Sequence, residues 1–119
     1  MSQIGAYTDN GITTQSRGGL VVMLYDGAVR FLNQAIAALA AGDMAAKGTN
    51  VAKAMDIINE LDCVLDMDAG GEVAQNLRSL YDFMRKHLQA AHLTNDGEKM
   101  KEVASLLSEL NEGWKAISD

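Results

Sequence analysis

The sequence predicts an all-α protein, an antiparallel up-down-up-down four-helix bundle with an N-terminal arm. Proline is absent from the 119 residues, and the glycines cluster at a few places that mark breaks between longer stretches. Four such stretches repeat their apolar residues with the period of an α-helix. The segments between them are short, and short connections make neighbouring helices in a bundle antiparallel.

A protein of this length has room for only one domain. We expect residues 1–16 to form the arm and residues 17–119 to form the bundle. The first 16 residues are polar and dotted with glycine. Ser16 has the side chain of a helix N-cap, so we expect the first helix to begin just after it.

The first helix carries more apolar residues than a bundle helix needs. One row comprises Leu20, Leu24, Phe31, Ala35 and Leu39, and ends before Gly42. A second row beside it comprises Val22, Tyr25, Val29, Leu32 and Ile36. About five positions in seven are therefore apolar, whereas a bundle helix needs about three. The surplus predicts a cover, which could be the arm, a second copy of the protein or a foreign segment.

The other three helices follow from the same reasoning. The second begins after Asp43 and ends at residues 68–71, where two glycines occur. The third begins near Glu72 and ends at residues 93–97. Asn95 or Asp96 caps the fourth, whose apolar stripe comprises Val103, Leu107, Leu110, Trp114 and Ile117.

Charge and hydropathy exclude several classes of partner. The formal net charge is −6, and the segment from Asp56 to Glu72 carries six carboxylates without one Lys or Arg. Such a field repels phosphate, so we expect neither nucleic-acid binding nor anionic-membrane binding. No apolar run approaches the roughly 18 residues that cross a bilayer, and the start lacks the features of a signal peptide. The sequence therefore predicts a cytoplasmic protein without membrane insertion.

No pattern indicates an enzyme, a cofactor or a metal site. A di-iron bundle needs a glutamate three residues before each histidine, and neither His87 nor His92 has one. Asp66 and Asp68 resemble the start of a calcium loop, but its twelfth position falls on Leu77. Cys63 is the only cysteine and is expected to be a half-buried structural residue.

Two other functions fit a four-helix bundle. A histidine phosphotransfer protein needs one exposed histidine, and His87 or His92 could supply it. An autonomous structural or signalling bundle would instead cover its surplus apolar face by forming a homodimer.

Four features together resemble the FliS family of flagellin-specific export chaperones over essentially the whole sequence. They are Tyr7 in "AYTDNGITTQS", the stretch "LVVMLYDGAVRFLNQA", the stretch "KAMDIINELDCVLDMDAGGEVAQNLRSLYDFM", and Trp114 near the end of the fourth helix. One departure is that family members usually begin the first helix with Ser-Pro, whereas Arg17 follows Ser16 here. This departure bears on how the N-terminal arm is held at the start of the first helix, and not on the resemblance to the family.

The resemblance implies a function for the surplus apolar surface. Family members are four-helix bundles that bind the disordered C-terminal segment of flagellin in the cytoplasm. They keep flagellin from polymerising early and pass it to the flagellar export apparatus. A member without its client is expected to be a monomer or a weak homodimer. Its N-terminal arm can cover part of the apolar surface.

On this resemblance we expect ten residues to contribute to client binding. Ile4 and Tyr7 of the arm would be a displaceable cover. The first helix would contribute Met23, Tyr25, Gly27, Val29 and Ile36, and the second helix would extend the surface with Ile57, Val64 and Ala69.

The tripeptide Leu-Tyr-Asp occurs at residues 24–26 and again at 80–82. We expect each leucine to face the core, each tyrosine hydroxyl to lie near water or a carboxylate, and each aspartate to lie toward the surface. The first copy is expected to lie nearer the client, and the second to hold the bundle together.

Overall fold

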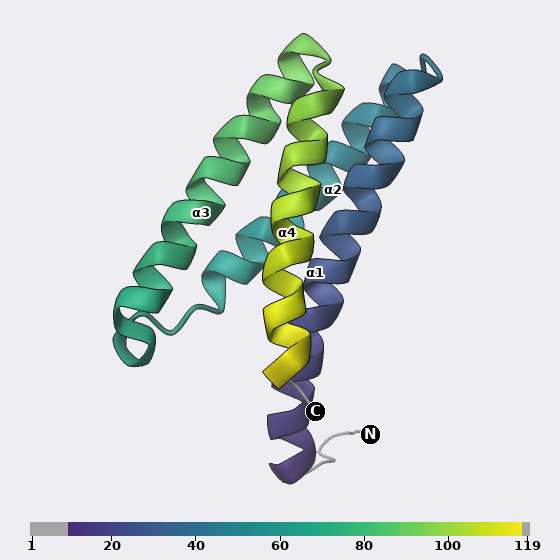
Figure 1. Cartoon of the computed structure of the whole chain (residues 1–119). Coiled ribbons are helices and arrows are strands. Elements are labelled where there is room, and N and C mark those ends of the chain that lie inside the picture. The colour runs from purple at the N-terminus through teal and green to yellow at the C-terminus, as the bar shows by residue number, and fades with distance from the viewer. Residues whose placement is uncertain (1–9, 118–119) are drawn as a thin grey trace.

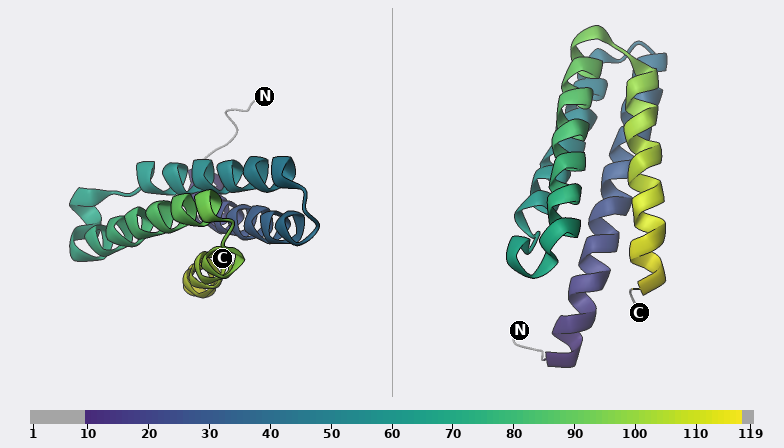
Figure 2. Two further views of the ribbon diagram at one scale, coloured as in Figure 1. Left: turned by 90° about the horizontal axis from the view of Figure 1, so that it is seen from above. Right: turned by 60° about the vertical axis from the view of Figure 1, so that its left-hand side comes forward.

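The structure, a computed structural model, describes residues 10–117, with side chains from residue 18 onward. It contains four helices, which are α1 (Asn10–Ala40), α2 (Met44–Cys63), α3 (Met67–Thr94) and α4 (Gly97–Ile117). Each helix runs antiparallel to the next (Figure 1). Both α1 and α3 pack against α2 and α4, so α1 and α3 occupy opposite corners (Figure 2). The predicted up-down-up-down bundle is confirmed.

The turns that join α1 to α2 and α3 to α4 use the residues that the sequence predicts. Gly42 follows α1 with a φ of 78°, a left-handed conformation that glycine adopts without strain. Asp43 then caps α2, because its Oδ1 accepts a hydrogen bond from the Ala46 N–H at 3.0 Å. Before α4, Asp96 Oδ1 accepts from the N–H groups of Glu98 and Lys99.

Three predicted helix boundaries are wrong, at the start of the first helix, the end of the second and the start of the third. The first helix starts at Asn10 and runs through Ser16, so Ser16 is not its N-cap. The arm as far as residue 9, with Ile4 and Tyr7, lies outside the described residues and stays a prediction. The second helix ends at Cys63, which is exposed rather than half-buried, instead of at residues 68–71.

The third helix begins five residues before the predicted start at Glu72. Asp66 initiates it at Met67, because Asp66 Oδ1 accepts from the Ala69 N–H at 2.9 Å. Gly71 then interrupts the helix with a φ of 53° and a ψ of −127°. The predicted glycine break therefore exists, but it lies inside α3, one turn after its start.

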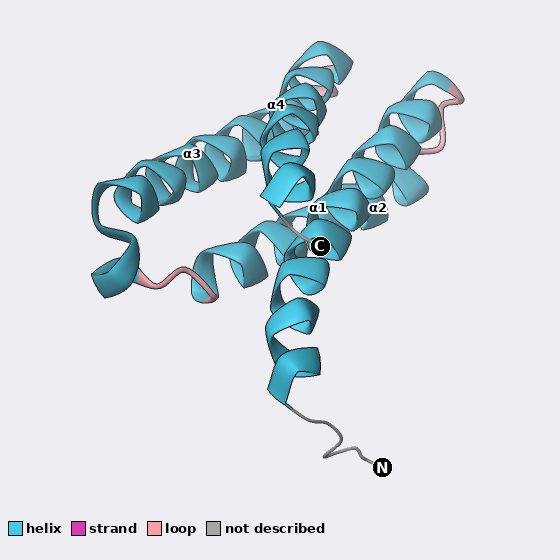
Figure 3. Ribbon diagram, turned by 60° about the horizontal axis from the view of Figure 1, so that its bottom comes forward, coloured by secondary structure: helices cyan, strands magenta, loops and turns pink. Residues whose placement is uncertain are grey.

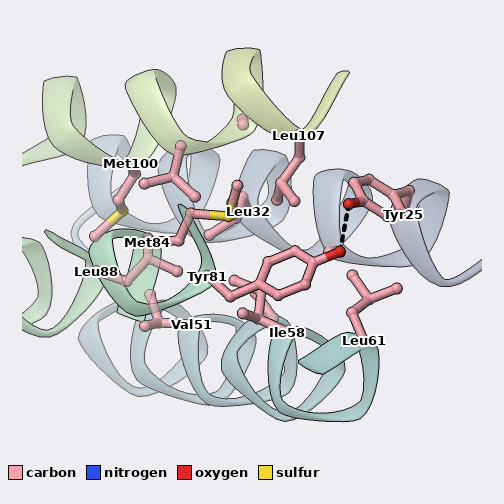
Figure 4. Packing of buried hydrophobic residues seen from close by; sticks show 14 of the residues in the cluster. Tyr25, Leu32, Val51, Ile58, Leu61, Tyr81, Met84, Leu88, Met100 and Leu107 are labelled. Atoms are coloured by element: carbon pink, nitrogen blue, oxygen red, sulfur yellow. Dashed lines mark hydrogen bonds between the residues drawn. The ribbon is translucent and has the colours of Figure 1, made fainter. Parts of the chain in front are cut away.

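The core is built from one buried stripe on each helix (Figure 4). Leu32 of α1, Ile58 of α2, Leu88 of α3 and Leu107 of α4 are all fully buried. Each contributes about 1.5–3 kcal/mol of stabilisation by removing its side chain from water.

The two Leu-Tyr-Asp motifs place their tyrosines, not their leucines, in the core. Tyr25 and Tyr81 are fully buried, while Leu24 and Leu80 are only partly buried at the edge of the cluster. The tyrosine hydroxyls form a hydrogen bond with each other at 2.6 Å, so the predicted water or carboxylate partner is wrong. The aspartates that follow are exposed, as predicted.

Most of the surplus apolar surface of α1 is covered by neighbouring helices. The fully buried stripe comprises Tyr25, Ala28, Leu32 and Ala35. Residues on both sides of this stripe, among them Phe31 and Val29, pack against the core from its margins. This breadth arises because α1 packs closely against both α2 and α4. The apolar surface of α1 that remains for the arm or a partner to cover is therefore smaller than the sequence suggests.

By length and composition alone, one segment of α1 could cross a membrane. Residues Gly18–Ala40 have a mean hydropathy of 1.2 over the best window. The same segment supplies Tyr25, Leu32 and Ala35 to the core of the bundle. A core helix of a bundle meets this criterion as readily as a spanning helix does.

Candidate functional site: an apolar groove at one end of the bundle

An apolar groove lies at the end of the bundle where α4 finishes and α2 connects to α3. Figure 3 turns this end toward the viewer. The groove has a volume of about 580 Å³. It is lined by Gly18, Leu20, Val21 and Leu24 of α1, by Val64 and Asp66 of the α2–α3 connection, and by Trp114 and Ile117 of α4. We call these eight residues the end groove.

Three large apolar side chains in the end groove are exposed to solvent. Leu20 and Val64 are each 51% exposed, and Ile117 is 76% exposed. They come from three separate elements and converge on one hollow. Contiguous apolar surface of this kind is typical of a binding site, whereas apolar residues scattered singly are ordinary.

The back of the end groove rests on the rigid core. The Trp114 ring lies beside the Tyr25 ring, with centroids 6.2 Å apart and planes tilted by 49°. The Tyr25 hydroxyl in turn contacts Tyr81 of α3. Burial raises the pKa of both hydroxyls above the usual value, so both stay neutral at physiological pH. The groove therefore has an uncharged aromatic base.

Two further hollows follow the line between α1 and α4, which we call the α1–α4 seam. The nearer one has a volume of about 530 Å³ and is lined by Val29, Asn33, Lys101, Ala104, Ser105, Ser108 and Glu109. The farther one, of about 490 Å³, is lined by Ile36, Leu39, Ala40, the residues 94–98 and Lys101. Lys101 lines both hollows, so they are neighbours along the seam. The seam is more polar than the end groove.

A polar bridge joins α1 to α4 between the end groove and the nearer hollow. Asn111 Nδ2 donates a hydrogen bond to Asp26 Oδ1 at 2.8 Å. Lys115 Nζ lies 3.5 Å from the same oxygen. Asp26 follows Leu24 of the end groove and precedes Val29 of the seam along α1. The bridge therefore marks where the apolar surface changes to a mixed one.

The structure places three of the predicted site residues along this face. Val64 lines the end groove, while Val29 and Ile36 line the two hollows of the seam. Val29 and Ile36 also pack partly against the core.

The other predicted residues lie elsewhere. Tyr25 and Gly27 are buried. A Cβ atom added at Gly27 would lie 3.2 Å from Ile57 Cδ1, so Gly27 admits a side chain of α2 rather than a foreign backbone. Met23 is 69% exposed but does not line the groove. Ala69 is exposed near the start of α3.

Of the eight residues of the end groove, sequence reasoning predicted only Val64, and it assigned Leu20, Leu24, Trp114 and Ile117 to the core-facing stripes. Leu20, Trp114 and Ile117 continue those stripes toward the end of the bundle. There α2 has already ended at Cys63, so no helix covers them fully. The sequence carries no local signal for them, because the mismatch in helix lengths that leaves the last turns of these stripes without a partner appears only in the structure.

The described residues contain no group of three or more His, Cys, Asp or Glu side chains that could hold a metal ion. His87 instead packs against Phe83, with ring centroids 4.8 Å apart, and its Nε2 contacts Glu102 of α4. This histidine therefore joins α3 to α4.

Comparisons of the sequence with known proteins identify its family. A family described as "Flagellar protein FliS" matches residues 1–119. The sequence is 43% identical to the flagellar secretion chaperone FliS of Salmonella typhimurium over 111 residues, which are 92% of this protein and 82% of the relative. The corresponding proteins of Vibrio cholerae and Bacillus subtilis are 36% and 33% identical, with 92% of this protein and 80% and 81% of theirs covered. The protein therefore belongs to the FliS family, whose members are flagellar secretion chaperones and not enzymes.

Proposed function

We propose that this flagellar chaperone binds the disordered C-terminal segment of flagellin in the cytoplasm, prevents its premature polymerisation and delivers it to the flagellar export apparatus. The end groove is the observation that carries the proposal. Leu20, Val64 and Ile117 present exposed apolar surface from three elements. Such a surface suits a client that hides its own apolar residues in the finished filament and exposes them before assembly.

The length of the binding face suits an extended client segment. From Gly18 to Ala40, α1 spans about 33 Å, because an α-helix rises 1.5 Å per residue. The end groove and the two hollows of the seam lie along this length. A client segment that orders on binding can place apolar side chains in successive hollows, at the cost of its own conformational freedom.

The N-terminal arm, with Ile4 and Tyr7, is proposed to cover part of this face when the client is absent. Because α1 begins at Asn10, the arm can be deleted without removing any of this helix. Deleting residues 1–9 leaves α1 whole, whereas deleting residues 1–16 also removes its first turns. The shorter deletion is expected to leave the bundle folded and client binding equal or tighter. Weaker binding by the shorter deletion would contradict the role as a cover.

Isothermal titration of the full-length protein with a peptide of the C-terminal segment of flagellin from the same organism tests the proposal. We expect heat of binding and one peptide bound per protein molecule. The free chaperone is expected to be a monomer or a weak homodimer by light scattering. A tight homodimer that binds no peptide would instead favour an autonomous bundle. Transfer of phosphate to His87 or His92 from a response regulator would favour a phosphotransfer protein.

A further inference from the structure

Lys47, in the first turns of α2, is the one buried charged residue among those that the structure describes. Only 4% of it is exposed. A buried lysine is rare unless its ammonium group is paired, because removing the charge from water is costly. No carboxylate of the described residues forms an ion pair with it. Other groups must therefore hold the ammonium, and they indicate its role.

The ammonium group of Lys47 donates two hydrogen bonds to the end of α3. Its Nζ lies 3.0 Å from the backbone oxygen of His92 and 2.7 Å from Oδ1 of Asn95. The last carbonyls of a helix have no partner inside the helix and form the negative end of its dipole, so a cation stabilises them. Asn95 follows α3 in a left-handed conformation, with a φ of 53° and a ψ of 46°. Lys47 thus holds both a final carbonyl of α3 and the residue at which the chain turns.

The turn that Lys47 holds is also a wall of the farther hollow of the α1–α4 seam. Residues 94–98 line this hollow together with residues of α1, among them Ile36 and Leu39. Gly97 in the turn lies close to α1, because a Cβ atom added to it would lie 3.5 Å from Leu39 Cδ2. No residue of α2 lines the hollow, and α2 does not pack directly against α4. Lys47 of α2 therefore reaches the hollow only through the turn.

Resting on the proposed function, we infer that Lys47 is a positioning residue for client binding. It fixes Asn95, and with it the turn between α3 and α4, where the turn shapes the farther hollow for the client. Lys47 itself does not touch the client. A lysine serves this purpose because its ammonium reaches a carbonyl and an amide oxygen at once, whereas an apolar side chain would leave both oxygens without that partner.

The hydrogen bond between Lys47 and Asn95 is detectable in the free chaperone. An ammonium group that is shielded from water and held by two hydrogen bonds exchanges its protons slowly, so the ¹⁵N-labelled protein should give a resolved Lys47 Nζ resonance. Asn95→Gly should shift this resonance, because glycine keeps the left-handed turn but lacks Oδ1. Asn95→Asp should keep the bond, because a carboxylate is also an acceptor. A Lys47 resonance that Asn95→Gly leaves unchanged would overturn the inference.

Two variants remove the donor and the acceptor one at a time. Lys47→Met replaces the ammonium with an apolar group of similar length, and Asn95→Gly removes the acceptor. Each is expected to weaken binding of the flagellin C-terminal peptide about threefold to tenfold, the effect of losing one hydrogen bond. Asn95→Asp should bind like the parent protein. Lys53→Met is the matched control, because Lys53 is an exposed lysine of α2 that lines neither the end groove nor the seam, and it should also bind normally.

A second comparison separates positioning from a general loss of stability. Ile36 lines the farther hollow, whereas Ile117 lines the end groove. If Lys47 acts through the farther hollow, Lys47→Met should cost less affinity in an Ile36→Ala background than in the parent protein. In an Ile117→Ser background it should keep its full cost. A bundle that is merely destabilised would lose the same affinity in both backgrounds. Asn95→Gly takes the place of Lys47→Met in this comparison if the latter does not fold.

The outcomes distinguish this inference from the proposed function. If the peptide binds the parent protein and Asn95→Gly with equal affinity, the inference is overturned while the proposed function stands. The inference also fails if Lys47→Met costs the same affinity in the Ile36→Ala and Ile117→Ser backgrounds. If the peptide binds none of the proteins, the proposed function falls and the inference falls with it.

Discussion

The hydroxyls of Tyr25 and Tyr81 form a buried hydrogen bond of 2.6 Å across the diagonal of the bundle. It joins α1 to α3, one of the two diagonal pairs of helices that do not pack directly against each other. Figure 4 shows the bond inside the apolar cluster, next to Leu61. Two tyrosines from repeated Leu-Tyr-Asp motifs thus satisfy each other's hydroxyl where no water or carboxylate is needed.

Removing one of these hydroxyls leaves the other buried without a partner. We therefore expect Tyr25→Phe or Tyr81→Phe to lower the free energy of unfolding by about 1–3 kcal/mol each. The double variant should lose less than the sum of the two, because neither hydroxyl is then left unpaired. Urea denaturation of the four proteins measures this coupling. Strictly additive losses would show that the hydrogen bond contributes nothing of its own.

The same pair predicts a loss of stability at alkaline pH. Burial raises the pKa of both hydroxyls above the unfolded value of about 10. Above that pH the unfolded state releases protons that the folded state keeps, so the stabilisation present below pH 10 decreases as pH rises. Unfolding measured at neutral pH and again above pH 10 checks this. The Tyr25→Phe/Tyr81→Phe double variant should show a smaller decrease, and an equal decrease would refute the assignment.

Gly27 and Gly113 allow a comparison of two helical glycines. A Cβ at Gly113 meets nothing within 4 Å, so Gly113→Ala should gain about 1 kcal/mol from helix propensity. A Cβ at Gly27 would lie 3.2 Å from Ile57 Cδ1, so Gly27→Ala should gain less. In an Ile57→Val background, which lacks that Cδ1, the two gains should become similar. Thermal unfolding of the variants measures these gains in stability. If Gly27→Ala in the parent protein gained as much stability as Gly113→Ala, the contact with Ile57 would not reduce the gain.

Substituting two apolar residues of α1 should affect client binding differently, because only one of them lines the α1–α4 seam. Val29 lines the nearer hollow, so Val29→Asp should weaken binding of the flagellin peptide by about 1–3 kcal/mol. Met23 is 69% exposed outside the groove and the seam, so Met23→Asp should bind normally. Circular dichroism should show that both variants keep their helical content. Unfolding of Val29→Asp would show that this residue belongs to the core instead.

The sequence is sufficient to predict the number, order and direction of the helices. Their periodic apolar stripes and the caps at Asp43 and Asp96 are local signals that the structure retains. The boundary expected at residues 68–71 is wrong for a physical reason. The glycines there favour a closing turn, yet the carboxylate of Asp66 caps a new turn of helix before Gly71.

The candidate site is less predictable, because it depends on which helices end where. Val64, Val29 and Ile36 follow from the apolar pattern, and the structure brings them to one face. Tyr25 and Gly27 belong to the same surplus, but the close approach of α2 and α4 buries them.

Leu20 and Ile117 have the spacing of core residues, and only the early end of α2 leaves them exposed. Such differences in helix length arise from tertiary packing and leave no local pattern. The end groove therefore becomes visible only once the four helices are placed beside one another.

The central claim is that the end groove binds the client, and two residues of equal exposure test it most directly. Ile117 lines the groove, whereas Leu93, in the last turn of α3, does not, yet each is 76% exposed. We expect Ile117→Ser to weaken binding of the flagellin C-terminal peptide at least several-fold in isothermal titration, while Leu93→Ser binds like the parent protein. Equal affinities for Ile117→Ser and the parent protein, or a larger loss for Leu93→Ser, would contradict the account.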